Sequence, residues 1–273
     1  MKTDYSQSAL ALDGEQVWAP TQEGILHWDG QHWQLYKEAS ASEGAAIVAG
    51  GGQVWVIDYT GKFSHFQAGH WQSQKLELPG VNWEANPDDG RVPQLARTAN
   101  GVVWLMWQGL WKLDGAKWTQ VTDGKSNLTH LIGAAGDRLW LSDAAGLHSI
   151  SMDGKHWTVY PPAQTGLTEQ AIVRDVASAA GRTLFGTAAG LLEFDDSQWR
   201  KLSLPSQQIA GAHSVAASAD GELWILGFSS SGSPRPYRYL FLVIGLLPLA
   251  VLGVVIWTFQ RFRRRQRQSQ RLR

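Results

Sequence analysis

A glycine-containing motif that returns at nearly regular intervals organises most of this chain. Glycine, one or two variable residues, an aliphatic residue and an aromatic residue occur six times, ending at Trp18, Trp55, Trp104, Trp140, Phe185 and Trp224. Successive aromatic residues lie 36 to 49 residues apart. A period of about 40 residues is the length of one propeller blade. The chain is therefore predicted to be a repeat protein.

Each unit carries the signals of four short strands. Asp29-Gly30, Asp114-Gly115 and Asp153-Gly154 stand between apolar runs, and Asp-Gly in that position predicts a hairpin because the turn needs the positive φ that glycine supplies. Runs of small and aliphatic residues, such as 45–49 and 172–177, precede the glycine motifs. Small residues suit the crowded inner strands of a propeller, where the blades converge on the axis.

These signals predict an all-β fold over residues 1–229, a β-propeller of about six four-stranded blades. The sixth blade is incomplete, because its second strand ends at Phe228. Residues 2–7 are expected to supply its outermost strand and so to help close the ring, since exposed strand edges invite pairing. A seven-bladed ring truncated at its N-terminus is the alternative. Most of the 15 Trp residues are expected to fill the space between neighbouring blades.

The motifs resemble the two-component-regulator propeller repeat, an Asp-x-x-Gly-x-apolar-Trp stretch followed by Gly-Leu and an apolar strand. The stretches that end at Trp18 and Trp224 carry the likeness, as do Gly-Leu pairs that begin at Gly109, Gly146 and Gly190. The resemblance implies a propeller of the kind that serves as an extracytoplasmic sensor ahead of a membrane helix and a kinase. Here only a short tail follows the apolar segment, so the expectation is a sensor-like propeller without a kinase.

A segment of twenty residues without a charge, 240–259, predicts one transmembrane helix after a linker at 230–239. As a helix it would span about 30 Å, the thickness of the hydrocarbon core. Tyr237, Tyr239 and Trp257 lie near its ends, where aromatic belts occur. A buried core helix is the alternative reading.

The charges around this segment predict its orientation. Seven arginines, including Arg261, Arg263, Arg264 and Arg265, lie in the tail at 260–273 and leave 17 basic against 24 acidic residues in the rest of the chain, a net charge of −7. The positive-inside rule puts the tail in the cytoplasm and the propeller outside. The N-terminus shows no signal peptide, so this orientation expects a signal that was removed or lies upstream, and a tail-anchored chain with a cytoplasmic propeller is the alternative. The tail is predicted to contact membrane lipid or to act only as a topology signal, and the acidic domain makes nucleic acid an unexpected partner.

No motif predicts catalysis, a cofactor or a metal site. The chain has no Cys, which excludes disulfides and thiolate ligands. His32, His70 and His156 each precede the Trp of an outer strand in a different blade, so they are expected around the rim. The remaining histidines lack ligand spacing, and no nucleophile elbow or phosphate loop is present.

A candidate binding face is predicted where one connection between blades is about ten residues longer than most. Loops after the second strands lie on the same side as these connections, and together they predict an aromatic and acidic surface for a sugar or a protein. Its candidate residues are Asp58, Tyr59, Trp83, Asp88, Asp89, Arg91, Trp107 and Asp143. A solvated loop is the alternative.

The sequence thus favours a non-enzymatic binding or protein-interaction module at a membrane, with an accessory subunit of a membrane complex as one form. A sensor for a carbohydrate-like ligand is the alternative. A propeller lyase or glycosidase would instead require acids and bases that converge at the axis. The inner strands offer Arg97, Arg174, Asp175 and His213 for that purpose.

Overall fold

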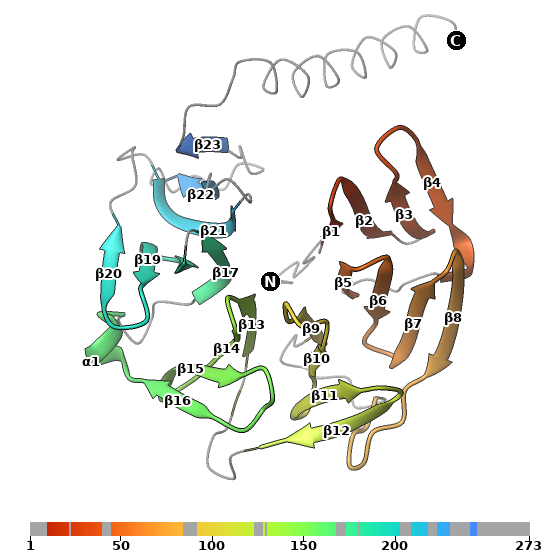
Figure 1. Ribbon diagram of the computed structural model, residues 1–273, viewed down its shortest axis with the longest axis horizontal. Helices are drawn as coiled ribbons and strands as arrows, with labels where there is room; N and C mark the ends of the chain where they lie inside the picture. The colour runs from red at the N-terminus through yellow and green to blue at the C-terminus, as the bar shows by residue number, and fades with distance from the viewer. Residues whose placement is uncertain are drawn as a thin grey trace, which may run out of the picture.

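The computed structural model describes residues 10–21, 23–39, 45–83, 92–122, 128, 130–167, 173–179, 181–202, 209–217, 223–229 and 241–244. Within them, six antiparallel sheets stand around a common centre (Figure 1). Five sheets have four strands, each following the last in sequence, and the sixth has three. The all-β propeller architecture predicted from the repeats is confirmed.

Each sheet is one blade, with its first strand nearest the centre (Figure 1). Blade 1 contains β1 (Ala11–Asp13), β2 (Gln16–Thr21), β3 (Gly24–Trp28) and β4 (Trp33–Tyr36), followed by the 3-10 turn η1 (Lys37–Ala39). Blade 2 contains β5 (Ala46–Gly50), β6 (Gln53–Ile57), β7 (Lys62–Gln67) and β8 (His70–Lys75). Blade 3 contains β9 (Gln94–Arg97), β10 (Val103–Met106), β11 (Leu110–Asp114) and β12 (Lys117–Val121).

The other three blades continue the ring. Blade 4 contains β13 (His130–Ala135), β14 (Arg138–Asp143), β15 (Gly146–Ser151) and β16 (Trp157–Tyr160), followed by the short helix α1 (Pro162–Thr165). Blade 5 contains β17 (Val173–Ala179), β18 (Arg182–Thr187), β19 (Gly190–Phe194) and β20 (Trp199–Leu202). Blade 6 contains β21 (Ile209–Ala217), β22 (Leu223–Ser229) and β23 (Phe241–Ile244).

The predicted hairpin turns join the third and fourth strands. In the first blade the carboxylate of Asp29 accepts hydrogen bonds from the amides of Gln31 and His32, at 2.7 and 2.6 Å, and Gly30 follows with φ of 100°. In the fifth blade Asp196 takes the place of that glycine with φ of 68°, a left-handed conformation that Asp tolerates better than most residues. The pair Asp195-Asp196 thus occupies the hairpin turn that Asp-Gly occupies in other blades.

Aromatic residues of the second strands fill the junctions between blades, as predicted. Trp18 packs against Phe66 and Trp71 of the next blade, and Trp140 packs edge-on against Phe185. A separate apolar cluster lies at each junction from blades 1–2 to blades 5–6. The core is therefore a series of layers between sheets and not one central core.

Blade 1 has a second apolar face, which points away from blade 2. The strand register puts one set of apolar side chains there: Leu12, Val17, Ala19, Leu26, Trp28, Trp33 and Leu35. Leu12 is 62% exposed and Trp33 is 54% exposed, whereas Trp18 on the opposite face is buried. Blade 6 stands across the opening from this face (Figure 1). Residues 2–7, which are expected to help close the ring, lie outside the described residues.

The predicted start of the transmembrane helix is wrong, because residues 241–244 form the third strand of blade 6. Phe241–Ile244, where the predicted transmembrane helix should begin, pairs with β22 from Leu226 to Leu223. Phe, Val and Ile favour strands, and an apolar run does not by itself distinguish strand from helix. Residues 245–259, with Tyr237, Tyr239, Trp257 and the arginine tail, lie outside the described residues. Among the residues that are described, no helix is long and apolar enough to cross a membrane.

Candidate binding face

The alternation of strands defines two faces of the ring. The first strand of each blade starts on the face that carries the connections between blades, and the loops between second and third strands return to that same face. We call it the loop face. Asp58, Tyr59, Trp83, Trp107 and Asp143 all lie on it, in or beside blades 2 to 4. Asp88, Asp89 and Arg91 lie outside the described residues.

Two tryptophans of the predicted binding face are buried and contact each other. Trp83 and Trp107 are 8% and 5% exposed, and their rings stack with centroids 5.7 Å apart and an interplanar angle of 8°. Gln108 fixes the same contact, since its side chain bonds the backbone N and O of Asn82 at 3.2 and 3.0 Å. The two rings therefore offer little free surface, because they pack between the loops.

The close approach of Trp83 to Gly61 gives a testable expectation. A Cβ at Gly61 would lie 2.5 Å from Cδ2 of Trp83, and Gly61 has φ of +79°. Gly61→Ala should lower the free energy of unfolding by about 1–3 kcal/mol more than Gly80→Ala. Gly80 is a matched control, because its φ is +76° but nothing lies within 4 Å of its added Cβ. Equal losses in urea unfolding of both variants would contradict the packing of Trp83 on Gly61.

The carboxylates of Asp58 and Asp143 hold the loops that carry them. Asp58 is buried and accepts hydrogen bonds from the amides of Thr60 and Lys62, at 2.9 and 3.0 Å. Asp143 accepts from the amide of Ala145 and contacts Nε2 of buried His148, both at 2.7 Å. Tyr59 lies between Asp58 and Thr60 and is 45% exposed. Among the described residues, the loop face thus presents a tyrosine on a fixed backbone, and the carboxylates of Asp58 and Asp143 are engaged within their own loops.

A polar cluster at the loop-face end of the inner strands includes residues that the sequence did not single out. Gln94 begins β9 and His130 begins β13, and Gln94 Nε2 lies 2.7 Å from His130 Nδ1. Gln94 Oε1 accepts the amide of Leu131 at 2.9 Å. Arg174 stands on β17, is exposed, and lies near enough to His130 to affect its pKa. We call Gln94, His130 and Arg174 the axial cluster.

The four residues considered for catalysis do not form one site. Inner strands all run from the loop face to the opposite face, so Arg97 at the end of β9 and Arg174 near the start of β17 lie at opposite ends of the axis. Arg97 packs over the ring of Trp55, 5.8 Å from its centroid. Asp175 bonds the amide of Val215 at 3.0 Å and the hydroxyl of Ser214, tying blade 5 to blade 6. The side chain of His213 lies outside the described set.

Metal ligands do not gather within the described part of the chain, where no group of three or more His, Asp or Glu could hold an ion. His32, His70 and His156 lie in blades 1, 2 and 4, as expected, and are exposed.

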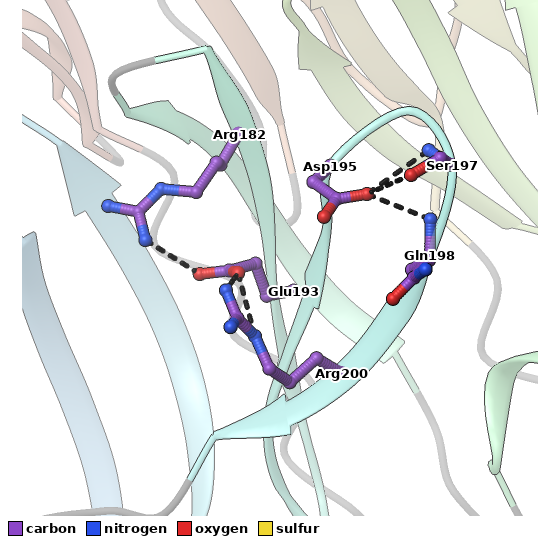
Figure 2. A network of polar contacts seen from close by, with 6 residues as sticks. All are labelled: Arg182, Glu193, Asp195, Ser197, Gln198 and Arg200. Atoms are coloured by element: carbon purple, nitrogen blue, oxygen red, sulfur yellow. Dashed lines mark hydrogen bonds and ion pairs between the residues drawn. The ribbon is translucent and has the colours of Figure 1, made fainter.

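Glu193 on blade 5 is a buried carboxylate with two arginine partners. Glu193 is 2% exposed and accepts from Arg182 Nη1 at 3.1 Å and from Arg200 Nε at 3.0 Å (Figure 2). Arg200 Nη2 also contacts Glu193 Oε1. The two guanidinium groups come from β18 and β20, on either side of Glu193 in β19. A buried carboxylate needs such partners because desolvation is costly.

The lowered pKa values of three histidines predict how the free energy of unfolding depends on pH. Burial lowers the pKa of His27, His65 and His130 below 6.5, and the Arg174 guanidinium lowers that of His130 further. In the unfolded chain these groups bind protons more readily, so stability present above about pH 6.5 should be lost as the pH falls below it. Tm should decrease between pH 7.5 and 5.5, and less steeply in His65→Gln. A Tm that rises over this range would contradict the expectation.

Comparison with known proteins shows the fold. No family model matches the chain, and no curated protein matches its sequence. Among solved structures, YCF48 bound to D1 peptide is 19% identical with a TM-score of 0.56, over 86% of this chain and 82% of that one. The chain is a β-propeller repeat protein. Its fold is shared with other propellers, and identities this low show the fold of this chain but not its activity.

Two further propellers of similar fold differ from each other in their described roles. The extracellular domain of the putative one component system BT4673 from B. thetaiotaomicron is 14% identical with a TM-score of 0.57, over 85% of this chain and 35% of that one. A catalytically inactive virginiamycin B lyase from Staphylococcus aureus, with quinupristin, is 12% identical with a TM-score of 0.57, over 89% and 86%. Sensor-type domains and enzymes therefore both occur among propellers similar to this one.

Proposed function

We propose that this chain is a non-enzymatic propeller that binds a protein partner through its loop face while the apolar segment after β23, residues 245–259, holds it at a membrane. The observation that carries the proposal is the exposed Tyr59 on a loop fixed by buried Asp58. Tyrosine is enriched at protein interfaces, and a fixed loop loses little conformational entropy on binding. The similar propeller YCF48 has a bound D1 peptide, which supports a peptide or protein as the ligand.

Other observations favour binding over catalysis. Asp175 joins blade 5 to blade 6, and Arg97 packs from blade 3 onto Trp55 of blade 2. A role as an accessory subunit of a membrane complex follows from a binding domain joined to one apolar segment. The second candidate function is recognition of a small carbohydrate-like ligand by the same face. The similar fold of the extracellular domain of the putative one component system BT4673 supports it.

Membrane attachment is the part of the proposal that rests on sequence. The uncharged residues 245–259, which follow β23, and the seven arginines after them support a single-pass anchor with the tail in the cytoplasm and the propeller outside. The arginines would lie near anionic headgroups, each contributing about 1 kcal/mol.

Alkaline carbonate extraction of native membranes tests the anchor. The wild-type chain should remain in the pellet, and a variant with Leu247→Arg, Val251→Arg and Val255→Arg should be released. Protease added to intact cells or right-side-out vesicles should digest the propeller and spare an epitope on the tail. Digestion only after the membrane is opened would instead support a tail-anchored chain with a cytoplasmic propeller.

The binding role predicts a stable complex in membranes. Pull-down from mildly solubilised membranes should bring down a stoichiometric partner, and Tyr59→Asp should reduce its amount several-fold. Lys117→Asp, at an exposed position on the outer strand β12, serves as the control. Recovery of the chain alone would contradict a protein-binding role and leave the small-ligand form.

A further inference from the structure

The apolar face of blade 1 that points away from blade 2, which we call the open face, carries a pair of tryptophans. Trp28 on β3 and Trp33 on β4 are cross-strand partners, and their ring centroids lie 5.3 Å apart at an interplanar angle of 45°. Phe66 and Trp71 hold the same two positions in blade 2, with centroids 5.3 Å apart at 49°. The two neighbouring blades therefore repeat one aromatic arrangement.

In blade 2 this aromatic pair receives a third ring from the preceding blade. Trp18 on β2 has its ring centroid 5.0 Å from that of Phe66 and 6.1 Å from that of Trp71. Trp140 contacts the corresponding pair of blade 5 in the same way. Both covering residues lie on the second strand of a sheet. A face of this kind thus accepts an aromatic side chain that a β-sheet presents.

On blade 1 the pair has no third ring among the described residues. Leu10, just before β1, is 65% exposed, and Leu12 and Trp33 of the open face are also exposed. Blade 6 does not cover them, although it is held on blade 5 by the hydrogen bond from the amide of Val215 to Asp175. An apolar area of this kind on a protein surface marks an interaction site.

Acidic residues border the sheet of blade 1 at both ends. Glu15, Glu23 and Asp29 lie in the turns between its strands and Glu38 follows the last strand, all exposed, whereas Lys37 is the only Lys or Arg in residues 10–39. This border repels the same face of a second copy and anionic lipid headgroups. The described strands of blade 6 contain no Lys or Arg to complement it.

We propose that the open face docks a β-sheet of another protein, which seats an aromatic side chain against Trp28 and Trp33 and places Lys or Arg residues opposite the acidic border. Sheets pack face to face through such apolar side chains, and complementary charges around the contact select the partner. The inference goes beyond the proposed function, because the open face is separate from Tyr59 on the loop face. Loss of binding in Tyr59→Asp and loss of binding at the open face are measured separately.

The test places the photo-crosslinking residue p-benzoylphenylalanine at Leu12 of the full chain in native membranes. Irradiation should attach one other protein, at a strand that carries an aromatic residue and has Lys or Arg close by in its sequence. Trp33→Asp should lower the adduct yield about tenfold, since an aromatic residue at the centre of an interface often contributes that much. Val159→Asp changes an exposed apolar residue of blade 4 and should leave the yield as in the wild type.

The acidic border is tested in the same experiment. Glu15→Lys with Glu23→Lys should lower the yield several-fold at low salt and less at high salt, because salt screens exposed charges. Glu77→Lys with Asp114→Lys makes the same charge change at exposed positions outside blade 1 and should have little effect. An adduct to lipid, to a second copy or within the chain itself, no adduct at all, or an unchanged yield in Trp33→Asp would overturn the proposal.

Discussion

Trp140→Ala should lower the free energy of unfolding by about 3–5 kcal/mol, the usual loss when a large buried aromatic side chain is removed. Trp140 is fully buried and contacts Tyr160 in its own blade and Phe185, Phe194 and Trp199 in the next. The substitution therefore opens a cavity in the layer that joins blades 4 and 5. Urea unfolding followed by circular dichroism measures the loss.

Trp33→Ala is the control for this prediction. Trp33 is 54% exposed on the second face of blade 1, so its removal should cost less than about 1 kcal/mol. Similar losses in the two variants would mean either that the layer between blades 4 and 5 contributes little or that the face of blade 1 is covered in the folded protein.

Removing both arginines around Glu193 should lower Tm by roughly 10 °C, because the buried carboxylate is left without a counter-charge. The variant is Arg182→Ala with Arg200→Ala, which changes two partly exposed side chains and leaves Glu193 in place. Differential scanning fluorimetry measures the shift.

A third substitution distinguishes charge from packing in that network. Glu193→Gln in the double variant removes the unpaired charge and should restore much of the lost stability. If the triple variant were no more stable than the double variant, the loss would come from the removed arginine side chains and not from the buried carboxylate.

Local patterns in the sequence were enough to predict the blades. The spacing of Trp18, Trp55, Trp104 and Trp140 marks the second strands, because the repeat places one large aromatic residue in each of them. Asp29-Gly30 marks a hairpin, because the turn is set by adjacent residues. The burial of Trp83 could not be predicted, since it depends on Gly61 and Trp107, which reach it only after two blades pack.

Other details of the sites also could not be predicted from the sequence. Asp58 and Asp143 looked like surface acids, but their partners Thr60 and His148 are recognised only once the loops are folded. The bulge that exposes Arg174 is a mismatch between two strands and leaves no signal in either strand alone. The start of the apolar segment was ambiguous for another reason, since its composition suits a strand as well as a helix.

The central claim, that the loop face binds a protein, is tested most directly by a photo-crosslinking amino acid at Tyr59, activated in native membranes. The account predicts one discrete crosslinked protein, identified by mass spectrometry, and no such product from the same probe at Lys155 on the opposite face. No adduct from Tyr59, or the same adducts from both positions, would contradict it.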